Sequence, residues 1–245
     1  MDNTIWIQNL QRKRFSYNMK KAGNSCNLKT CFLCRNCLKH WLPAVEANKQ
    51  NLDFKKGQKI FEEGNAVMGI YFLFNGKVKV HRRWGKEKQL ILHFAKEGDI
   101  VGYRGLGNQK VYPVSATALG DVTVCFIDIP FFETTLQANP RLTYTLMQFY
   151  ANELQHAERR IGNLVHLDVK SRVAETLLML KRDFGENENG HINITLTKQD
   201  LASYAGTTYE TFFRMITELE KEKIVRLSGK AIAIVKEKKL EKLIG

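Results

Sequence analysis

The chain has 245 residues, 44% of them apolar, and a formal net charge of +13. This length and apolar content suffice for one large or two modest domains with a buried core. No apolar run approaches the ~18 residues of a membrane span, and the first residues lack the features of a signal peptide. We therefore expect a cytoplasmic protein with no membrane partner.

The positive charge is concentrated near the N-terminus. Residues 1–60 carry a net +9, residues 61–169 carry +1, and residues 170–245 carry +3. We take residues 1–50 as a basic arm that precedes the first folded domain. Three interpretations of its charge remain open: contact with DNA phosphates, a solvated tail, or a positive setting for a metal cluster.

The arm holds four of the five cysteines, at Cys26, Cys31, Cys34 and Cys37, while Cys125 lies far along the chain. We expect no disulfides among them, because the cytosol keeps thiols reduced. The spacing of the last three, Cys-x2-Cys-x2-Cys, is typical of loops that hold a [4Fe–4S] cluster. A closed zinc site made from the four arm cysteines is one alternative, and the absence of any metal is another.

The pattern of residues 51–139 predicts a domain of short antiparallel strands. Short apolar runs alternate with glycine turns, and six or more strands at this spacing indicate a barrel or sandwich. The Asn75-Gly76 pair, between the apolar residues 71–74 and the alternating residues 77–80, is a strong signal for a β-hairpin. A short helix is also expected just before this domain, near residues 41–48.

Residues 140–167 predict a long dimerisation helix. Apolar residues recur there at alternating spacings of three and four, as in the a/d seam of a coiled coil. Polar residues surround this narrow seam, which favours a partner helix and hence a homodimer over a helix lying on its own β-domain. The seam residues are Met147, Tyr150, Leu154, Ala157, Ile161 and Leu164.

Residues 168–245 predict a winged helix-turn-helix domain. Thr197 and Asp200 have the spacing of a capping box, and Gly206 supplies a turn before a second helix. Residues 224–227 and 231–235 are expected to form a small β-hairpin, which an ordinary helical hairpin would lack. Because a recognition helix presents its N-terminal residues to base edges, the candidate base contacts are Tyr209, Glu210, Phe213 and Arg214. Thr208 and Thr211 complete the set of candidate DNA-binding residues.

The segment from Gly206 to Arg214, Gly-Thr-Thr-Tyr-Glu-Thr-Phe-Phe-Arg, resembles the recognition-helix motif of the Crp/Fnr transcription regulators. The resemblance extends over roughly residues 54–243. It implies that Glu210 and Arg214 read a G·C pair while Thr211 holds a phosphate, and the hydrogen-bonding groups of Arg and Glu suit guanine and cytosine. Phe213 departs from the small residue usual at its position and offers a thymine methyl only an apolar contact.

The resemblance implies an α+β fold: an N-terminal cyclic-nucleotide-type antiparallel β-roll that is the sensor domain, a long dimerisation helix and a C-terminal winged helix-turn-helix. In nucleotide-binding members a Glu holds the ribose and an Arg pairs with the cyclic phosphate. Tyr103 and Val114 stand at those positions here, and Arg104 lies outside the motif. We therefore expect no cyclic nucleotide as ligand.

The same region looks more like the oxygen-sensing Fnr branch. Residues 116–125 align without gaps to a strand of that branch whose cysteine is a distant fourth cluster ligand. The resemblance implies that Cys31, Cys34, Cys37 and Cys125 ligate an iron–sulfur cluster, with Cys26 as an alternate, although the Fnr pattern is wider between its second and third ligands. Cys125 could instead be a small buried apolar residue.

Together these patterns predict a homodimeric, sequence-specific transcription regulator. Its partners would be palindromic double-stranded DNA and RNA polymerase, and a redox- or oxygen-responsive iron–sulfur cluster would control it. The alternatives are a regulator of the same class with another small-molecule ligand, or one with a structural zinc site. An enzyme is not expected, because no histidine lies in a known catalytic arrangement and the sequence has no phosphate-binding loop.

Overall fold

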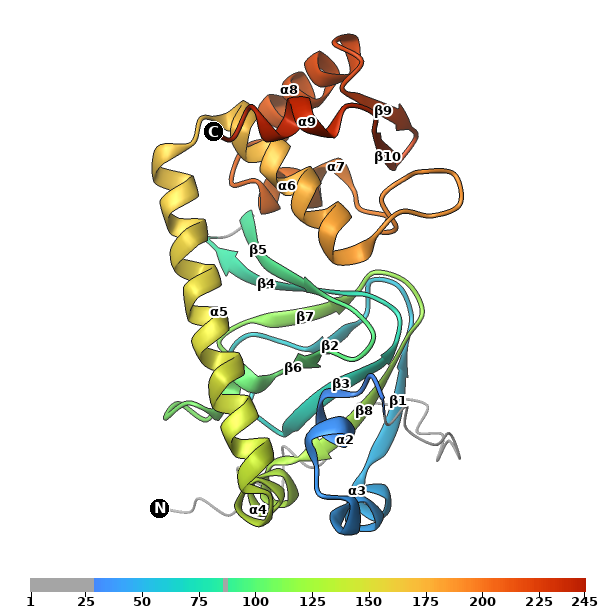
Figure 1. The fold of residues 1–245 in the computed structure, drawn as a ribbon. Coiled ribbons are helices and arrows are strands. Elements are labelled where there is room, and N and C mark those ends of the chain that lie inside the picture. Colours follow the sequence, from blue (N-terminus) through green and yellow to red (C-terminus); the bar gives the residue numbers. More distant parts are fainter. Residues whose placement is uncertain (1–28, 86–87) are drawn as a thin grey trace.

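The computed structural model describes residues 29–85 and 88–245 (Figure 1). It has the α+β architecture expected from the sequence. A β-roll of two antiparallel sheets is joined by the long helix α5 (Pro140–His166) to a C-terminal helix-turn-helix domain with a two-stranded wing. In the described ranges, no helix is both long and apolar enough to span a membrane.

The β-roll consists of two four-stranded sheets whose inner faces share one core. Apolar residues from both sheets, such as Leu73, Val80 and Val124, are buried in the same cluster. The sheet orders are β1-β8-β3-β6 and β2-β7-β4-β5, and every pairing is antiparallel. The strands are β1 (Gln50–Phe54), β2 (Lys59–Phe61), β3 (Gly69–Asn75), β4 (Val78–Trp84), β5 (Lys88–Ala95), β6 (Ile100–Val101), β7 (Ser115–Ala118) and β8 (Val122–Asp128).

The prediction of a β-hairpin around Asn75-Gly76 is wrong. The turn is present, but β3 pairs with β6 and β8, whereas β4 pairs with β5 and β7. The turn therefore carries the chain from one sheet to the other, because the apolar faces of β3 and β4 must cover the shared core from opposite sides. Gly76 has a φ of 92°, and a Cβ there would lie 2.5 Å from the carbonyl oxygen of Asp121, so glycine is required.

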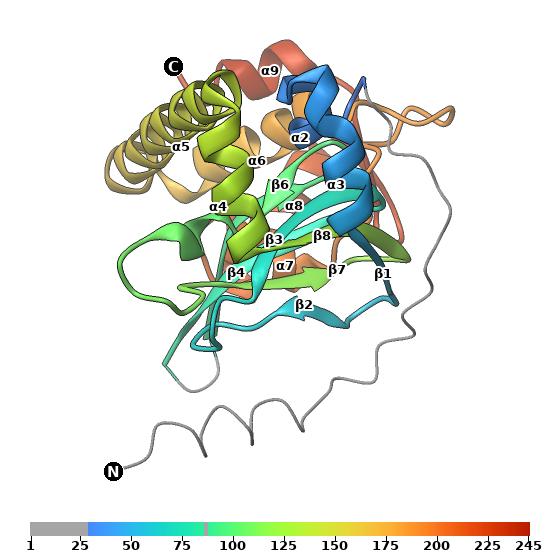
Figure 2. The same cartoon turned by 90° about the horizontal axis from the view of Figure 1, so that it is seen from below.

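Short helices cover the end of the roll that is remote from the C-terminal domain (Figure 2). One of them, α3, is the short helix expected near residues 41–48. The first of them, α2, contacts α5. The short helices of the N-terminal half are α2 (Phe32–Asn36), α3 (Leu42–Asn48), α4 (Ile129–Ala138) and the 3₁₀ helices η1 (Lys39–Trp41) and η2 (Tyr103–Leu106).

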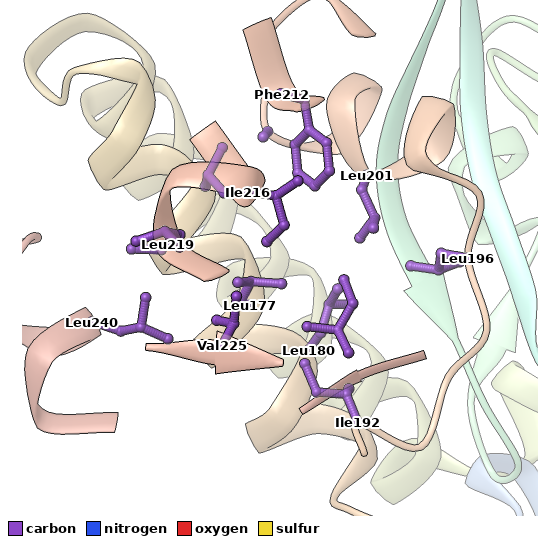
Figure 3. Packing of buried hydrophobic residues seen from close by; sticks show 14 of the residues in the cluster. Leu177, Leu180, Ile192, Leu196, Leu201, Phe212, Ile216, Leu219, Val225 and Leu240 are labelled. Atoms are coloured by element: carbon purple, nitrogen blue, oxygen red, sulfur yellow. The ribbon is translucent and has the colours of Figure 1, made fainter. Parts of the chain in front are cut away.

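The C-terminal domain is a winged helix-turn-helix built around a single apolar core (Figure 3). Asp168 caps its first helix by accepting a hydrogen bond from the backbone N–H of Ser171. Thr197 and Asp200 form the predicted capping box, with both reciprocal bonds present. Its elements are α6 (Val169–Phe184), α7 (Lys198–Tyr204), α8 (Tyr209–Lys221), β9 (Val225–Ser228), β10 (Ala231–Ile234) and α9 (Glu237–Glu241).

Candidate nucleic-acid interface and sensor site

Helix α8 has one buried face and one face turned to solvent. Phe212, Ile216 and Leu219 are completely buried and point into the core that α6, α7 and the wing share (Figure 3). Gly206 makes the preceding turn with a φ of 65°, and Thr208 caps the helix by accepting from the N–H of Thr211. Packing and capping together hold the N-terminal half of α8 in a defined orientation.

The six predicted DNA-contacting residues lie at this N-terminal end. Tyr209 and Phe213 are 41% and 43% exposed, and Glu210 and Arg214 are also exposed. Thr211 is half-buried, and its hydroxyl accepts a hydrogen bond from that of Thr208 at 3.1 Å. The two charged side chains therefore stand clear of the domain core, as side chains that read bases must.

Lys198, the first residue of α7, also reaches this surface, and it is not among the residues predicted from the sequence. Its ammonium lies 4.4 Å from the centre of the Phe213 ring, a cation–π contact between the two helices. The capping box at Thr197 was a local signal that α7 begins here, but the spacing of the two helices in the sequence does not say which side chains meet.

Helix α7 is also attached to the β-roll. The Lys79 ammonium of β4 lies 2.6 Å from the Asp200 carboxylate, and both side chains are largely buried. The Ser203 hydroxyl donates to the carbonyl of Gln89 at 2.7 Å and accepts from the N–H of Ile91 at 3.0 Å. These contacts set the orientation of the helix-turn-helix relative to the roll.

Arg160 extends this attachment to α5. Its guanidinium donates to the carbonyls of Ile91 at 2.7 Å and Tyr204 at 2.8 Å, and also to that of Leu92. It lies 4.3 Å from the centre of the Tyr204 ring. One half-buried cation thus joins α5, β5 and α7, so a change in the position of α5 bears directly on the DNA-binding domain.

The outer face of α5 exposes several large apolar side chains to solvent. Met147, Leu154 and Ile161 are 58%, 61% and 61% exposed, and Ala157 is exposed as well. Exposed Tyr144 and Val165 extend this face toward both ends of the helix.

Two other predicted seam residues contact their own chain. Tyr150 is half-buried, and its hydroxyl donates to the carbonyl of Tyr103 at 2.5 Å. Leu164 lies beside the helix-turn-helix turn, where its Cδ2 is 2.5 Å from the position that a Cβ on Gly206 would occupy. These two residues therefore lie at the inner edge of the seam rather than at its centre.

Tyr103 and Val114, which the resemblance places at the positions of the nucleotide-binding Glu and Arg, are both buried in the roll. The Tyr103 hydroxyl donates to the carboxylate of Glu153 on α5, and the Arg104 guanidinium lies 3.3 Å from the same carboxylate. Burial raises the pKa of the Tyr103 phenol, which keeps it a proton donor. In the segment where the resemblance places the phosphate-binding cassette, η2 thus contacts α5, and Arg104 is paired with Glu153.

Three of the candidate cysteine ligands lie in one apolar cluster. Cys31 immediately precedes α2, Cys34 lies within α2, and Cys125 lies in the middle of β8. Leu142 and Leu146 of α5 belong to the same cluster. The fold therefore brings a cysteine that is about 90 residues distant in the sequence to the same core region as the arm.

Cys37 lies at the border of this cluster. Its thiol donates to the side-chain oxygen of buried Asn139 at 3.2 Å, and the same oxygen accepts from the N–H of Leu38 at 2.9 Å. Burial raises the pKa of the Cys37 thiol. In this arrangement Cys37 is a hydrogen-bonded thiol, and to become a ligand it would have to leave Asn139.

Residues 29–85 and 88–245 contain no group of three or more His, Cys, Asp or Glu side chains arranged to hold a metal ion. Cys26, the alternate ligand, lies outside the described residues. Cys31, Cys34, Cys37 and Cys125 thus supply thiols, the ligands of an iron–sulfur cluster, in one region of the fold. Their side chains are not arranged as ligands of a bound metal.

Comparison with known proteins identifies both domains. Residues 51–139 match the family model described as cyclic nucleotide-binding domain, and residues 171–243 match the Crp-like helix-turn-helix domain. A CRP-like cAMP-activated global transcriptional regulator of Mycobacterium tuberculosis is 27% identical over 195 residues, which cover 79% of this chain and 87% of the relative. The fumarate and nitrate reduction regulatory protein of Vibrio cholerae is 23% identical over 244 residues, or 96% of this chain and 97% of the relative.

The fold agrees with solved structures. FixK2 from Bradyrhizobium japonicum superposes with a TM-score of 0.72 at 23% identity, covering 80% of this chain and 98% of that chain. The fold and the matched relatives define a DNA-binding transcription regulator rather than an enzyme. The chain belongs to the Crp/Fnr family.

Proposed function

We propose that the protein acts as a homodimer that reads a palindromic DNA site with one α8 helix from each chain and regulates transcription through RNA polymerase. The observation that carries this proposal is the exposed pair Glu210 and Arg214 on a capped, well-packed helix. Residues four apart lie on one stripe of a helix. In the major groove, the Arg would bind guanine O6 and N7, and the Glu would accept from cytosine N4.

The apolar outer face of α5 supports the dimer. Large exposed side chains such as Met147, Leu154 and Ile161 recur every seven residues, which is the repeat of a two-helix seam. A second copy would cover the same face by symmetry. A two-fold dimer of this kind would set the recognition helices about 34 Å apart, one turn of DNA.

Arg214→Ala tests the DNA-reading role. The cognate duplex is first selected from random double-stranded DNA with the wild-type protein. The variant should bind this duplex about 1–3 kcal/mol more weakly and should lose discrimination at one G·C pair, because a bidentate base contact is removed. Fluorescence anisotropy with cognate and random duplexes measures both effects. Arg141→Ala, an exposed arginine at the remote end of α5, is the control and should bind normally. Equal losses on cognate and random DNA would make Arg214 a phosphate contact only.

We further propose that Cys31, Cys34, Cys37 and Cys125 hold a redox-responsive [4Fe–4S] cluster, which would supply the sensitivity to oxygen. The support is the position of the four residues around one apolar cluster that includes Leu146 of α5. The ring of Phe32, between the first two of these cysteines, meets Phe149 of α5 edge-on at 5.5 Å. A displacement of the cysteine-bearing helix would therefore reach α5 and its outer face.

Protein purified without oxygen should be brown, with broad absorbance near ~400 nm that bleaches in air, as expected for a cysteine-ligated iron–sulfur cluster. Cys125→Ser should remove this absorbance, while the matched variant Cys26→Ser should retain it. Equal losses in the two variants would require another ligand set. Colourless anaerobic protein that binds one zinc per chain, and still binds it after Cys125→Ser, would support a structural zinc site. Metal-free protein would leave a small-molecule ligand as the alternative.

A further inference from the structure

Two exposed aromatic rings lie on the DNA-facing side of α8. The rings of Tyr209 and Phe213 are stacked, with centroids 6.2 Å apart and planes inclined by 12°. The Lys198 ammonium contacts Phe213 from α7. Single exposed apolar residues are ordinary on protein surfaces, but this pair is held in one orientation by its own stacking and by a cation from a second helix.

The pair lies next to the charged stripe. Successive residues of an α-helix are separated by about 100° around the axis, so the stripe of Tyr209 and Phe213 is adjacent to that of Glu210 and Arg214. If the charged stripe reads a G·C pair, the aromatic stripe faces the neighbouring base pair. The only apolar group that an unmodified base pair presents in the major groove is the thymine C5-methyl.

We propose that Tyr209 and Phe213 form a methyl-reading platform that selects a thymine next to the G·C pair of each half-site. This inference rests on the proposed reading of DNA by α8. Lys198 limits the freedom of the Phe213 ring before binding, which lowers the entropy lost when the ring meets the base. A ring cannot form the hydrogen bond that a small polar residue offers there, so specificity would come from apolar contact.

The test uses a palindrome selected by the wild-type protein from random double-stranded DNA, then synthesised with deoxyuridine in place of thymidine at one position at a time in both half-sites. Burial of a methyl-sized group corresponds to roughly fourfold in affinity. At one symmetric pair of positions, deoxyuridine should therefore weaken wild-type binding by roughly fifteenfold. At the same position, 5-methylcytosine should bind more tightly than cytosine, because the methyl rather than the thymine carbonyl is read.

The double variant Tyr209→Ser/Phe213→Ser, which removes both rings, should bind the thymidine and deoxyuridine duplexes equally while keeping its preference for the G·C pair. Trp84→Ser, which removes an exposed ring at the end of β4, is the control and should retain the methyl effect. Wild-type protein that binds the selected palindrome but shows no loss with deoxyuridine at any position would overturn the inference and leave the proposed function intact. Failure to select any sequence would instead contradict the proposed function.

Discussion

At the scale of single residues, Tyr103 is the clearest departure from a nucleotide-binding roll. Its side chain is buried, its hydroxyl donates to Glu153 of α5, and its ring meets that of Phe149 edge-on at 4.9 Å. By the resemblance, this bulky phenol stands where nucleotide-binding members of the family carry a carboxylate for the ribose. Val114 adds only apolar surface, which cannot neutralise a phosphate.

We expect no binding of cyclic AMP or cyclic GMP for this reason. Isothermal titration calorimetry on protein that is shown to bind DNA should give no heat of binding at millimolar nucleotide. Tyr103→Phe, which removes only the hydroxyl, should behave in the same way, because the ring still fills the site. Micromolar affinity of the wild-type protein for either nucleotide would refute this expectation.

Local residue patterns were predictable, and contacts between distant residues were not. The caps at Thr197 and Thr208 and the turn at Gly206 follow from rules that act within a few residues. The contact of Lys198 with Phe213 depends on the angle between two helices. The hydrogen bond from Cys37 to Asn139 joins residues about a hundred positions apart, and no local pattern marks it.

At the scale of elements, helix α5 has one face packed on the roll and one face exposed to solvent. Its inner face packs on the roll through residues such as Leu142 and Leu146, which are buried. Its outer face carries Met147, Leu154 and Ile161, which are more than half exposed. A heptad pattern does not by itself distinguish a partner helix from the chain's own roll, which is why the predicted seam includes residues such as Tyr150 that contact their own chain.

Ile161→Glu should convert the dimer to monomers, because a carboxylate in the middle of an apolar interface is desolvated without a partner. Analytical ultracentrifugation should show one chain per particle, and binding to the palindrome should be lost. Asn152→Glu is a matched control, because this exposed residue lies about 180° around the helix axis from Ile161, outside the predicted seam. A dimer that survives Ile161→Glu would place the interface elsewhere.

At the scale of the whole molecule, the two domains and the connecting helix form a continuous set of contacts. Lys79 meets Asp200, and Arg160 links α5, β5 and α7. The domain types were predictable because each has its own periodicity and turn signals. The way in which the domains meet was not, because the paired residues are up to 121 positions apart. The assignment of β3 and β4 to different sheets was missed because hairpin signals assume that sequential strands pair.

The central claim is that two copies of the chain place two recognition helices on one palindrome. It is tested most directly by comparing the affinity and stoichiometry of the protein on the selected full palindrome and on a duplex of equal length that retains one half-site. We predict two chains per full palindrome and binding to the half-site duplex that is roughly 100-fold weaker or more, because the second helix then adds no specific contact. Equal affinity for the two duplexes, with one chain bound to each, would contradict the claim.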